Sequence, residues 1–207
     1  MYLKTLPLNF GKPTFYLGYF LGVMMGDGSF GYYGGKEKSN YAINLQTVSE
    51  QFADLFRKIL SELTGFKVWK SAFERKSGSY RRKTFNIMAQ SKALHDYLLS
   101  SLDSGIPKIC YENEECLKGF VSGFFDSDGC LIHDRTYFYL DFANNNTRIL
   151  YDLRELFVKR GFHPTNIWEN RSSSKTFKQN KPVYRFKLGR QQEVKMLRAG
   201  WLRGFKK

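Results

Sequence analysis

The hydrophobic pattern of the chain alternates between helical spacing and strand spacing. A helix is predicted between Ser49, a candidate N-cap, and Gly65. Its apolar positions recur every three or four residues: Phe52, Leu55, Phe56, Ile59, Leu60 and Leu63. Alternating apolar and polar residues, bounded by Gly, Ser and Asn, predict strands over residues 29–38, 41–48, 67–74 and 80–89. A second helix is predicted over residues 91–101.

The second half of the chain repeats this order of elements. Strands are predicted over residues 136–143, 165–170 and 183–188, and helices over 147–160 and from Gln191 onward. Each half opens with an apolar segment of helical length. The pattern therefore predicts an α+β fold built from two pseudo-symmetric αββαββα repeats.

A direct repeat at the head of each half supports this division. Residues 17–28 align with residues 118–129, so that Gly18, Gly22 and Gly26 match Gly119, Gly123 and Ser127. Small residues every four positions line one face of a helix and let another backbone approach closely. A glycine inside a helix costs roughly 1 kcal/mol relative to alanine, so the stripe requires a compensating contact. We expect Gly18, Gly22, Gly119 and Gly123 to pack the two helices against each other.

Each of these helices ends in Asp-Gly, at Asp27 and Asp128. For a single occurrence, a helix-ending turn is the simpler interpretation, but two matched occurrences favour a shared role. The glycine spacing also occurs in membrane helices. The apolar segment 15–25 is about half the length that a bilayer requires, so we expect no membrane span.

The charge balance points to a polyanionic partner. Lys and Arg number 33 against 19 Asp and Glu, which gives a formal net charge of +14. An aromatic content of 17% argues against disorder. The three cysteines have no zinc-ligand spacing and no disulfide framework, and the first residues do not resemble a signal peptide. An intracellular protein, cytoplasmic or organellar, is expected.

Basic residues crowd the predicted hairpins of both halves. In the strand over 183–188, Arg185 and Lys187 alternate with apolar residues, which predicts a sheet with one cationic exposed face. Two such sheets would cover two half-sites of duplex DNA, because a two-stranded ribbon fits the major groove. The candidate DNA contacts are Tyr32, Lys36, Lys38, Lys70, Arg75, Arg81, Arg82, Lys83, Arg135, Arg171, Lys175, Lys178, Arg185 and Lys187.

Residues 20–28 (Phe-Leu-Gly-Val-Met-Met-Gly-Asp-Gly) and 121–129 (Val-Ser-Gly-Phe-Phe-Asp-Ser-Asp-Gly) both resemble the LAGLIDADG motif of homing endonucleases. The resemblance covers nearly the whole chain and is to single-chain, two-motif, intron-encoded members of archaeal type. It implies one repeat over residues 10–105 and another over 106–207, saddle-shaped antiparallel sheets, motif helices at the interface and a monomer.

The resemblance also implies an active site. Asp27 and Asp128 would hold divalent cations over the scissile phosphates, with help from the backbone carbonyls of Gly26 and Ser127. Gln46 and Asn144, at strand ends, match polar residues near the attacking water, and Lys108 matches a lysine near the phosphate. In the second half, the corresponding basic candidates are Arg203, Lys206 and Lys207. Met25 departs from the motif's first acidic position, which Asp126 keeps.

The implied activity is hydrolysis of both strands of a long, pseudo-palindromic duplex with Mg²⁺, leaving short 3′ overhangs. Mn²⁺ is expected to substitute for Mg²⁺, and Ca²⁺ to bind without supporting cleavage. One alternative is a maturase that binds intron RNA without cutting DNA. Another is a DNA-binding regulator on the same scaffold, although such a protein has no need for both motif aspartates.

Overall fold

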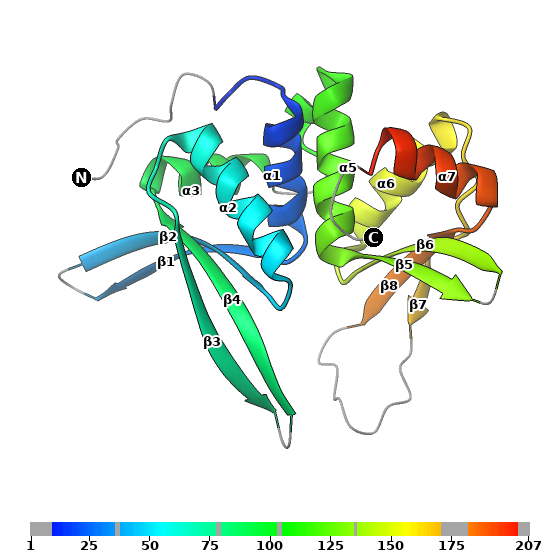
Figure 1. Ribbon diagram of the computed structural model, residues 1–207. Coiled ribbons are helices and arrows are strands. Elements are labelled where there is room, and N and C mark those ends of the chain that lie inside the picture. The colour runs from blue at the N-terminus through cyan, green and yellow to red at the C-terminus, as the bar shows by residue number, and fades with distance from the viewer. Residues whose placement is uncertain are drawn as a thin grey trace.

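The computed structural model describes residues 10–35, 38–77, 80–102, 105–134, 136–170 and 182–202. Its first half contains α1 (Phe15–Met25), β1 (Gly28–Gly35), β2 (Lys38–Thr47), α2 (Glu50–Thr64), β3 (Trp69–Ser77), β4 (Tyr80–Gln90) and α3 (Lys92–Ser101). Its second half contains α5 (Glu114–Asp128), β5 (Gly129–Asp134), β6 (Tyr137–Asn144), α6 (Thr147–Lys159), β7 (Trp168–Asn170), β8 (Val183–Leu188) and α7 (Gln191–Gly200). The predicted αββαββα order is confirmed in both halves (Figure 1). A short helix between them, α4 (Lys108–Tyr111), was not predicted.

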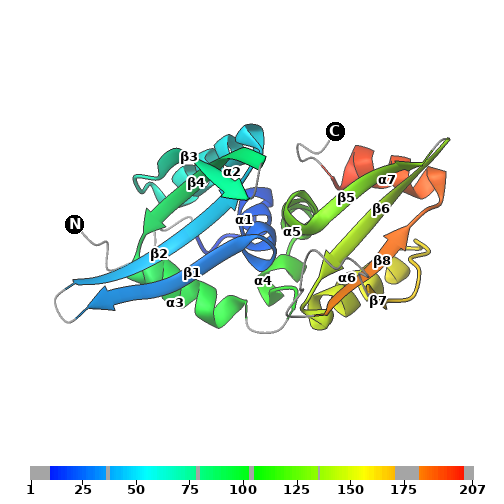
Figure 2. The same ribbon diagram turned by 90° about the horizontal axis from the view of Figure 1, so that it is seen from below.

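Each half forms a four-stranded antiparallel sheet with the same topology. The strand order is β1-β2-β4-β3 in the first sheet and β5-β6-β8-β7 in the second. Figure 1 shows the helices above the sheets, and the view from below in Figure 2 shows the strands uncovered. We call the helix-free side of each sheet its open face.

Local sequence signals explain where the long helices begin and end. The Ser49 side chain accepts a hydrogen bond from the Phe52 N–H at the start of α2, and Asn146 caps α6 in the same manner. Gly65, with a φ of 64°, and Gly161, with a φ of 79°, follow their C-terminal ends. Left-handed backbone of this kind favours glycine, which is why both ends were visible in the sequence.

The two motif helices, α1 and α5, lie side by side between the sheets (Figures 1 and 2). A Cβ atom at Gly18 would overlap the Cys116 carbonyl oxygen, and one at Gly22 would overlap that of Phe120. Reciprocally, Gly119 and Gly123 lie against the backbone of α1. The predicted interface of small residues is confirmed, and the close backbone approach explains why glycine occupies these positions.

A buried polar contact also links the two motif helices. The Tyr19 hydroxyl of α1 donates a 2.7 Å hydrogen bond to Asp126 Oδ2 of α5. Both residues are buried, with exposed fractions of 1% and 4%. Burial, reinforced by the Asp126 carboxylate, raises the pKa of Tyr19. In the described part of the chain, no helix has the length and apolarity to cross a membrane.

Candidate metal site and nucleic-acid interface

The two motif aspartates come together where α1 and α5 end. Asp27 follows Gly26, the C-cap of α1, and Asp128 is the last residue of α5. A Cβ atom at Gly26 would overlap the Ser127 side chain and lie 3.2 Å from Asp128 Oδ2. The carboxylate of one half therefore lies directly beside the backbone that carries the aspartate of the other. Figure 2 shows both helices almost end-on between the two sheets.

The electrostatics of this junction suit a hard cation. Helix C-terminal ends carry partial negative charge on their last carbonyl groups, and neither α1 nor α5 has a basic residue in its last turn. Two carboxylates add to this field, and oxygen donors of both kinds are the ligands that Mg²⁺ and Ca²⁺ prefer. The oxygen donors at Gly26, Asp27, Ser127 and Asp128 are of the kind that divalent cations prefer, although in the described part of the chain no three His, Cys, Asp or Glu side chains form a metal-binding group.

A cleft of about 240 Å³ opens beside Asp27. It is lined by Asp27, Thr47, Val48, Ser49, Phe52, Asp126 and Ser127. Residues from the turn after α1, the end of β2, the start of α2 and the end of α5 thus share one cleft, which brings Asp27 and Asp126 from opposite halves to the same space.

The residue that is equivalent to Asn144 in the first half is not Gln46, as the sequence suggested. Asn144 donates a side-chain hydrogen bond to Asp128 Oδ2, while its Oδ1 atom accepts from the Asn146 N–H at 2.7 Å. In the first half, Thr47 Oγ1 accepts from the Ser49 N–H at 3.1 Å. The structural equivalent of Asn144 is therefore Thr47.

Strand register leads to the same equivalence. Leu45 pairs with Gly28, and Phe142 pairs with Gly129, so Leu45 matches Phe142 and Gln46 matches Ala143. Gln46 is exposed and lies on the open face, one residue before Thr47. The expected symmetry between Gln46 and Asn144 is wrong by one residue, and a one-residue shift in a strand reverses the side-chain face.

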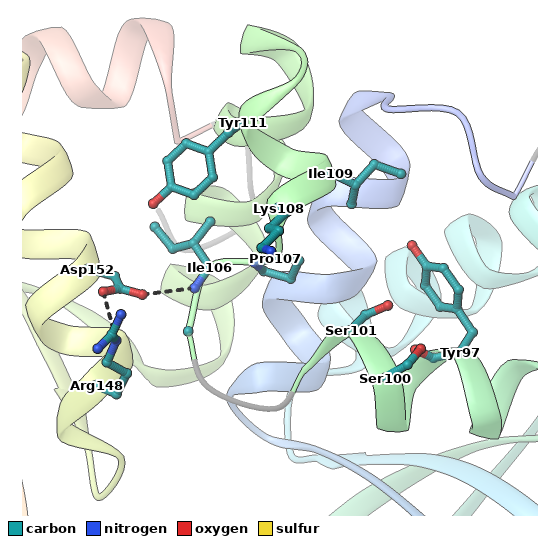
Figure 3. A pocket seen from close by; sticks show the side chains of 11 residues that line it. Tyr97, Ser100, Ser101, Ile106, Pro107, Lys108, Ile109, Tyr111, Arg148 and Asp152 are labelled. Atoms are coloured by element: carbon teal, nitrogen blue, oxygen red, sulfur yellow. Dashed lines mark hydrogen bonds and ion pairs between the residues drawn. The ribbon is translucent and has the colours of Figure 1, made fainter.

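Lys108 is not brought to the aspartates. It opens α4 before the N-terminal end of α5, whereas Asp128 is the last of the 15 residues of that helix. At 1.5 Å per residue, α5 alone separates the two by roughly 20 Å. Lys108 lines a cavity of about 630 Å³. Figure 3 shows it there with Tyr97, Tyr111, Arg148 and Asp152, which also line the cavity. Arg203, Lys206 and Lys207 lie outside the described residues.

Four of the predicted DNA-contacting residues lie on the open faces. Arg75 and Arg82 are register partners in the β3–β4 hairpin and are exposed. On the second sheet, Arg185 and Lys187 alternate with the buried Phe186 and Leu188, as predicted. Lys187 Nζ lies 4.3 Å from the Tyr139 ring centroid and 5.7 Å from that of Trp168.

Other predicted contacts lie on the helix-covered side. Lys70 Nζ forms ion pairs with Glu50 at 3.0 Å and Asp54 at 2.8 Å, both on α2, and these partners raise the pKa of Lys70. Tyr32 pairs with Tyr41, whose ring contacts His95 of α3. These two placements correct the expected DNA-facing orientation.

The remaining predicted contacts divide into two groups. Arg81 and Lys83 are exposed and share the side of β4 that carries Phe85; Lys83 Nζ lies 5.0 Å from the Phe85 ring centroid. Lys36, Arg135, Arg171, Lys175, Lys178 and the side chain of Lys38 lie outside the described residues.

One residue that the sequence interpretation missed is Asp141 of β6. It is on the open face, with an exposed fraction of 4%, and its Oδ2 atom lies 3.3 Å from Arg185 Nη1. Burial raises the pKa of Asp141, while Arg185 and Lys187 oppose that rise. Its alternation with Leu140 and Phe142 was a sequence signal for the open face, but burial there could not be foreseen.

Comparisons with known proteins agree with this architecture. A family model described as a LAGLIDADG-like domain matches residues 115–190. An uncharacterized protein of Methanocaldococcus jannaschii is 29% identical over 154 residues, which is 71% of this chain and 54% of the relative. The chain thus spans about half the length of that relative.

Among solved structures, the homing endonuclease I-DmoI in complex with DNA and Mn matches 94% of this chain and 99% of its own, with a TM-score of 0.60 and 19% identity. The chain shares its fold with I-DmoI. The N-terminal LAGLIDADG domain of WhiA matches 97% of this chain and 86% of its own, with a TM-score of 0.63 and 14% identity.

The likeness to I-DmoI extends over both halves of the chain, because a match to 94% of the residues cannot leave out either half. At 19% identity, it defines the fold and not the chemistry. The side chains at the junction of α1 and α5 must therefore carry the functional conclusion.

Proposed function

We propose that this chain is a metal-dependent, site-specific DNA endonuclease that hydrolyses both strands of a long, pseudo-palindromic duplex. The observation that carries the proposal is the meeting of Asp27 and Asp128 at the adjoining ends of α1 and α5, between two sheets with uncovered faces. Each sheet would cover one half-site, and the joint helix tips would face the DNA backbone between them.

The roles of the site residues follow from their positions. Asp27 and Asp128, with the Gly26 and Ser127 carbonyl oxygens, would hold Mg²⁺, with Mn²⁺ as a functional substitute and Ca²⁺ as a ligand that does not support cleavage. Bound Mg²⁺ would neutralise charge on the phosphate and lower the pKa of a water molecule. Structures of I-DmoI with DNA and Mn, with DNA and Ca, and with DNA in the presence of Mg support this choice of cations.

The supporting residues make the two halves of the site unequal. Asn144 holds the Asp128 carboxylate, whereas Thr47 has a shorter side chain at the equivalent place. Gln46 projects from the open face nearby and would orient a water molecule or a phosphate. Lys108 has no part in this site, because it lies at the other end of α5.

The cut would be staggered, leaving short 3′ overhangs. A single chain supplies both half-site surfaces, residues 10–105 and 106–207, so the protein would act as a monomer. The net charge of +14 supports binding to the phosphate backbone, and this electrostatic attraction weakens as salt rises.

The test begins with the full chain and a library of random DNA duplexes. Wild-type protein should enrich one sequence in Ca²⁺ and cut it in both strands in Mg²⁺. Asp27→Asn and Asp128→Asn should each bind that sequence but cut it at least about a hundredfold more slowly, because even residues that only orient metal ligands contribute about 10- to 100-fold. Lys58→Gln on the outer surface of α2 is the control and should cut normally.

Three outcomes would contradict the proposal. Undiminished cutting by both asparagine variants would remove the aspartates from the chemistry. Sequence-specific binding without cleavage in Mg²⁺ or Mn²⁺ would favour a regulator. Selective binding to folded intron RNA over every duplex would favour a maturase.

A further inference from the structure

Hydrogen-bonding groups that lack partners cluster on the open faces. In the described part of the chain, the buried side-chain polar atoms without a hydrogen-bond partner are Asn86 Oδ1, Asp141 Oδ1 and Arg185 Nε. Buried polar atoms in folded proteins are nearly always paired, so each exception needs a physical reason. All three atoms belong to residues on the sheet side that the proposed function assigns to DNA.

Two of these residues occupy the same place in the two repeats. Leu45 of the first half matches Phe142 of the second, and these residues pair with Ile87 and Phe186 respectively. The neighbouring positions follow from that register. Asn86 is therefore equivalent to Arg185, and Asn44 is equivalent to Asp141.

The chemistry at these equivalent positions differs between the halves. In the second sheet, Asp141 and Arg185 are joined across neighbouring strands, and Lys187 is the register partner of Asp141. In the first sheet, the corresponding three positions hold Asn44, Asn86 and Met88, of which none is charged. The repeat thus keeps the backbone arrangement and replaces a charged set with a neutral one.

The charged set in the second sheet is fixed in place before any ligand binds. Asp141, with an exposed fraction of 4%, holds one end of the Arg185 guanidinium at 3.3 Å. Lys187 Nζ contacts the Tyr139 and Trp168 rings. Side chains that are already positioned lose less conformational freedom on binding, which improves selectivity between partners.

Base edges in the major groove match these two sets differently. Arginine pairs with the O6 and N7 atoms of guanine, and a carboxylate accepts from the N4 amino group of cytosine. Asparagine pairs with N6 and N7 of adenine, and an apolar side chain contacts the thymine methyl group. A G·C pair therefore suits Arg185, which Asp141 holds in place, whereas an A·T pair suits Asn44, Asn86 and Met88.

We propose that these equivalent positions read different base pairs, so that the target has G·C in the half-site under the second sheet and A·T at the matching step under the first. Arg185 is the base-contacting residue of the second sheet and Asp141 is the residue that positions it. This inference rests on the proposed DNA-binding function. The inference predicts a DNA target whose two half-sites differ at one matching base-pair step, although the protein backbone is nearly the same in both halves.

The experiment exchanges the two sets and selects targets again from random duplexes in Ca²⁺. Asp141→Asn combined with Arg185→Asn should replace G·C by A·T at one step of one half-site, with a change in preference of about tenfold or more. Asn44→Asp combined with Asn86→Arg should produce the opposite replacement in the other half-site. Lys58→Gln is again the control and should leave the selected sequence unchanged.

The Asp141→Asn single variant separates positioning from base contact. It should keep guanine as the preferred base but reduce the preference, whereas Arg185→Lys should reduce it further because lysine lacks the planar fork. Thermal midpoints would establish that each variant is folded, and the two single variants decide the question where an exchange variant does not fold.

The outcomes distinguish the two proposals. Folded exchange variants that select the wild-type sequence would overturn the assignment of these positions while leaving the endonuclease proposal intact. Equal weakening on all sequences would also overturn it, because that result indicates phosphate contacts. Failure of the wild-type chain to enrich any duplex would overturn both proposals.

Discussion

At the scale of single residues, the clearest sequence signal was the spacing of the small residues in the motif helices. Gly18, Gly22, Gly119 and Gly123 were predicted from the repeat alone, because glycine in a helix interior is costly unless it allows a close backbone contact. Thr47 was missed, although it precedes its N-cap by two residues, as Asn144 does. The sequence carries this capping pattern in both halves, whereas Gln46 resembles Asn144 only in having an amide side chain.

A comparison of two glycine substitutions tests the helix interface. Gly22→Ala should destabilise the chain by about 2–3 kcal/mol, because its Cβ would overlap the Phe120 carbonyl oxygen and core overpacking costs about 1–3 kcal/mol. Gly200→Ala, in α7 with open space around its Cβ position, should be neutral or stabilise by up to about 1 kcal/mol. Urea unfolding would measure both, and equal effects would disprove the close packing.

At the scale of elements, periodicity predicted the order of helices and strands and the exposed side of Arg185 and Lys187, but it did not show on which side of the first sheet each basic residue of β3 and β4 lies. Lys70 and Arg75 belong to the same strand, yet Lys70 pairs with α2 while Arg75 lies on the open face. Alternation alone puts residues five positions apart on opposite faces, but β3 carries polar residues on both faces, so its sequence did not show which face α2 covers. The short helix α4 was missed because four residues are too few for a periodic pattern.

The ends of α5 and α6 are joined by a contact whose effect depends on pH. Arg160 donates to both carboxylate oxygens of Glu114, at 2.5 and 2.6 Å, and this hydrogen bonding lowers the pKa of Glu114 from 4.5. A lowered folded-state pKa contributes stability that is complete above about 4.5 and is lost as pH falls through the lowered value.

Glu114→Gln should therefore destabilise the chain at pH 7 by no more than about 1 kcal/mol, because both side chains are partly exposed and the ion pair is screened. Urea unfolding at pH 7 and pH 3 would measure the difference from wild type, which should shrink at pH 3. Glu62→Gln, in an exposed pair with Lys58 at 3.8 Å, is the matched control. A difference that grows at pH 3 would contradict this role.

At the scale of the whole molecule, the fold and the junction of α1 with α5 were predictable from the sequence. The difference between the side chains at equivalent positions of the two sheets was not. The repeat of residues 17–28 at 118–129 required two equivalent units, and matched helices with carboxylate ends placed Asp27 beside Asp128. The first sheet has a neutral pair, Asn44 and Asn86, where the second sheet has a charged pair, Asp141 and Arg185. Only the strand register shows that these two pairs are equivalent. Under the proposed function, the pseudo-symmetry places the candidate site at the junction of the halves, and the side-chain differences would set which base pairs each half reads.

The most direct measurement of the central claim is anomalous X-ray diffraction from crystals of the DNA-bound chain grown with Mn²⁺. Asp27 and Asp128 should bind one or more Mn²⁺ ions, visible as anomalous peaks, that also contact DNA phosphate oxygens. Asp128→Asn crystals should show a weakened or missing peak on that side. Mn²⁺ bound away from both aspartates, or DNA bound on the helix-covered side of the molecule, would contradict the account.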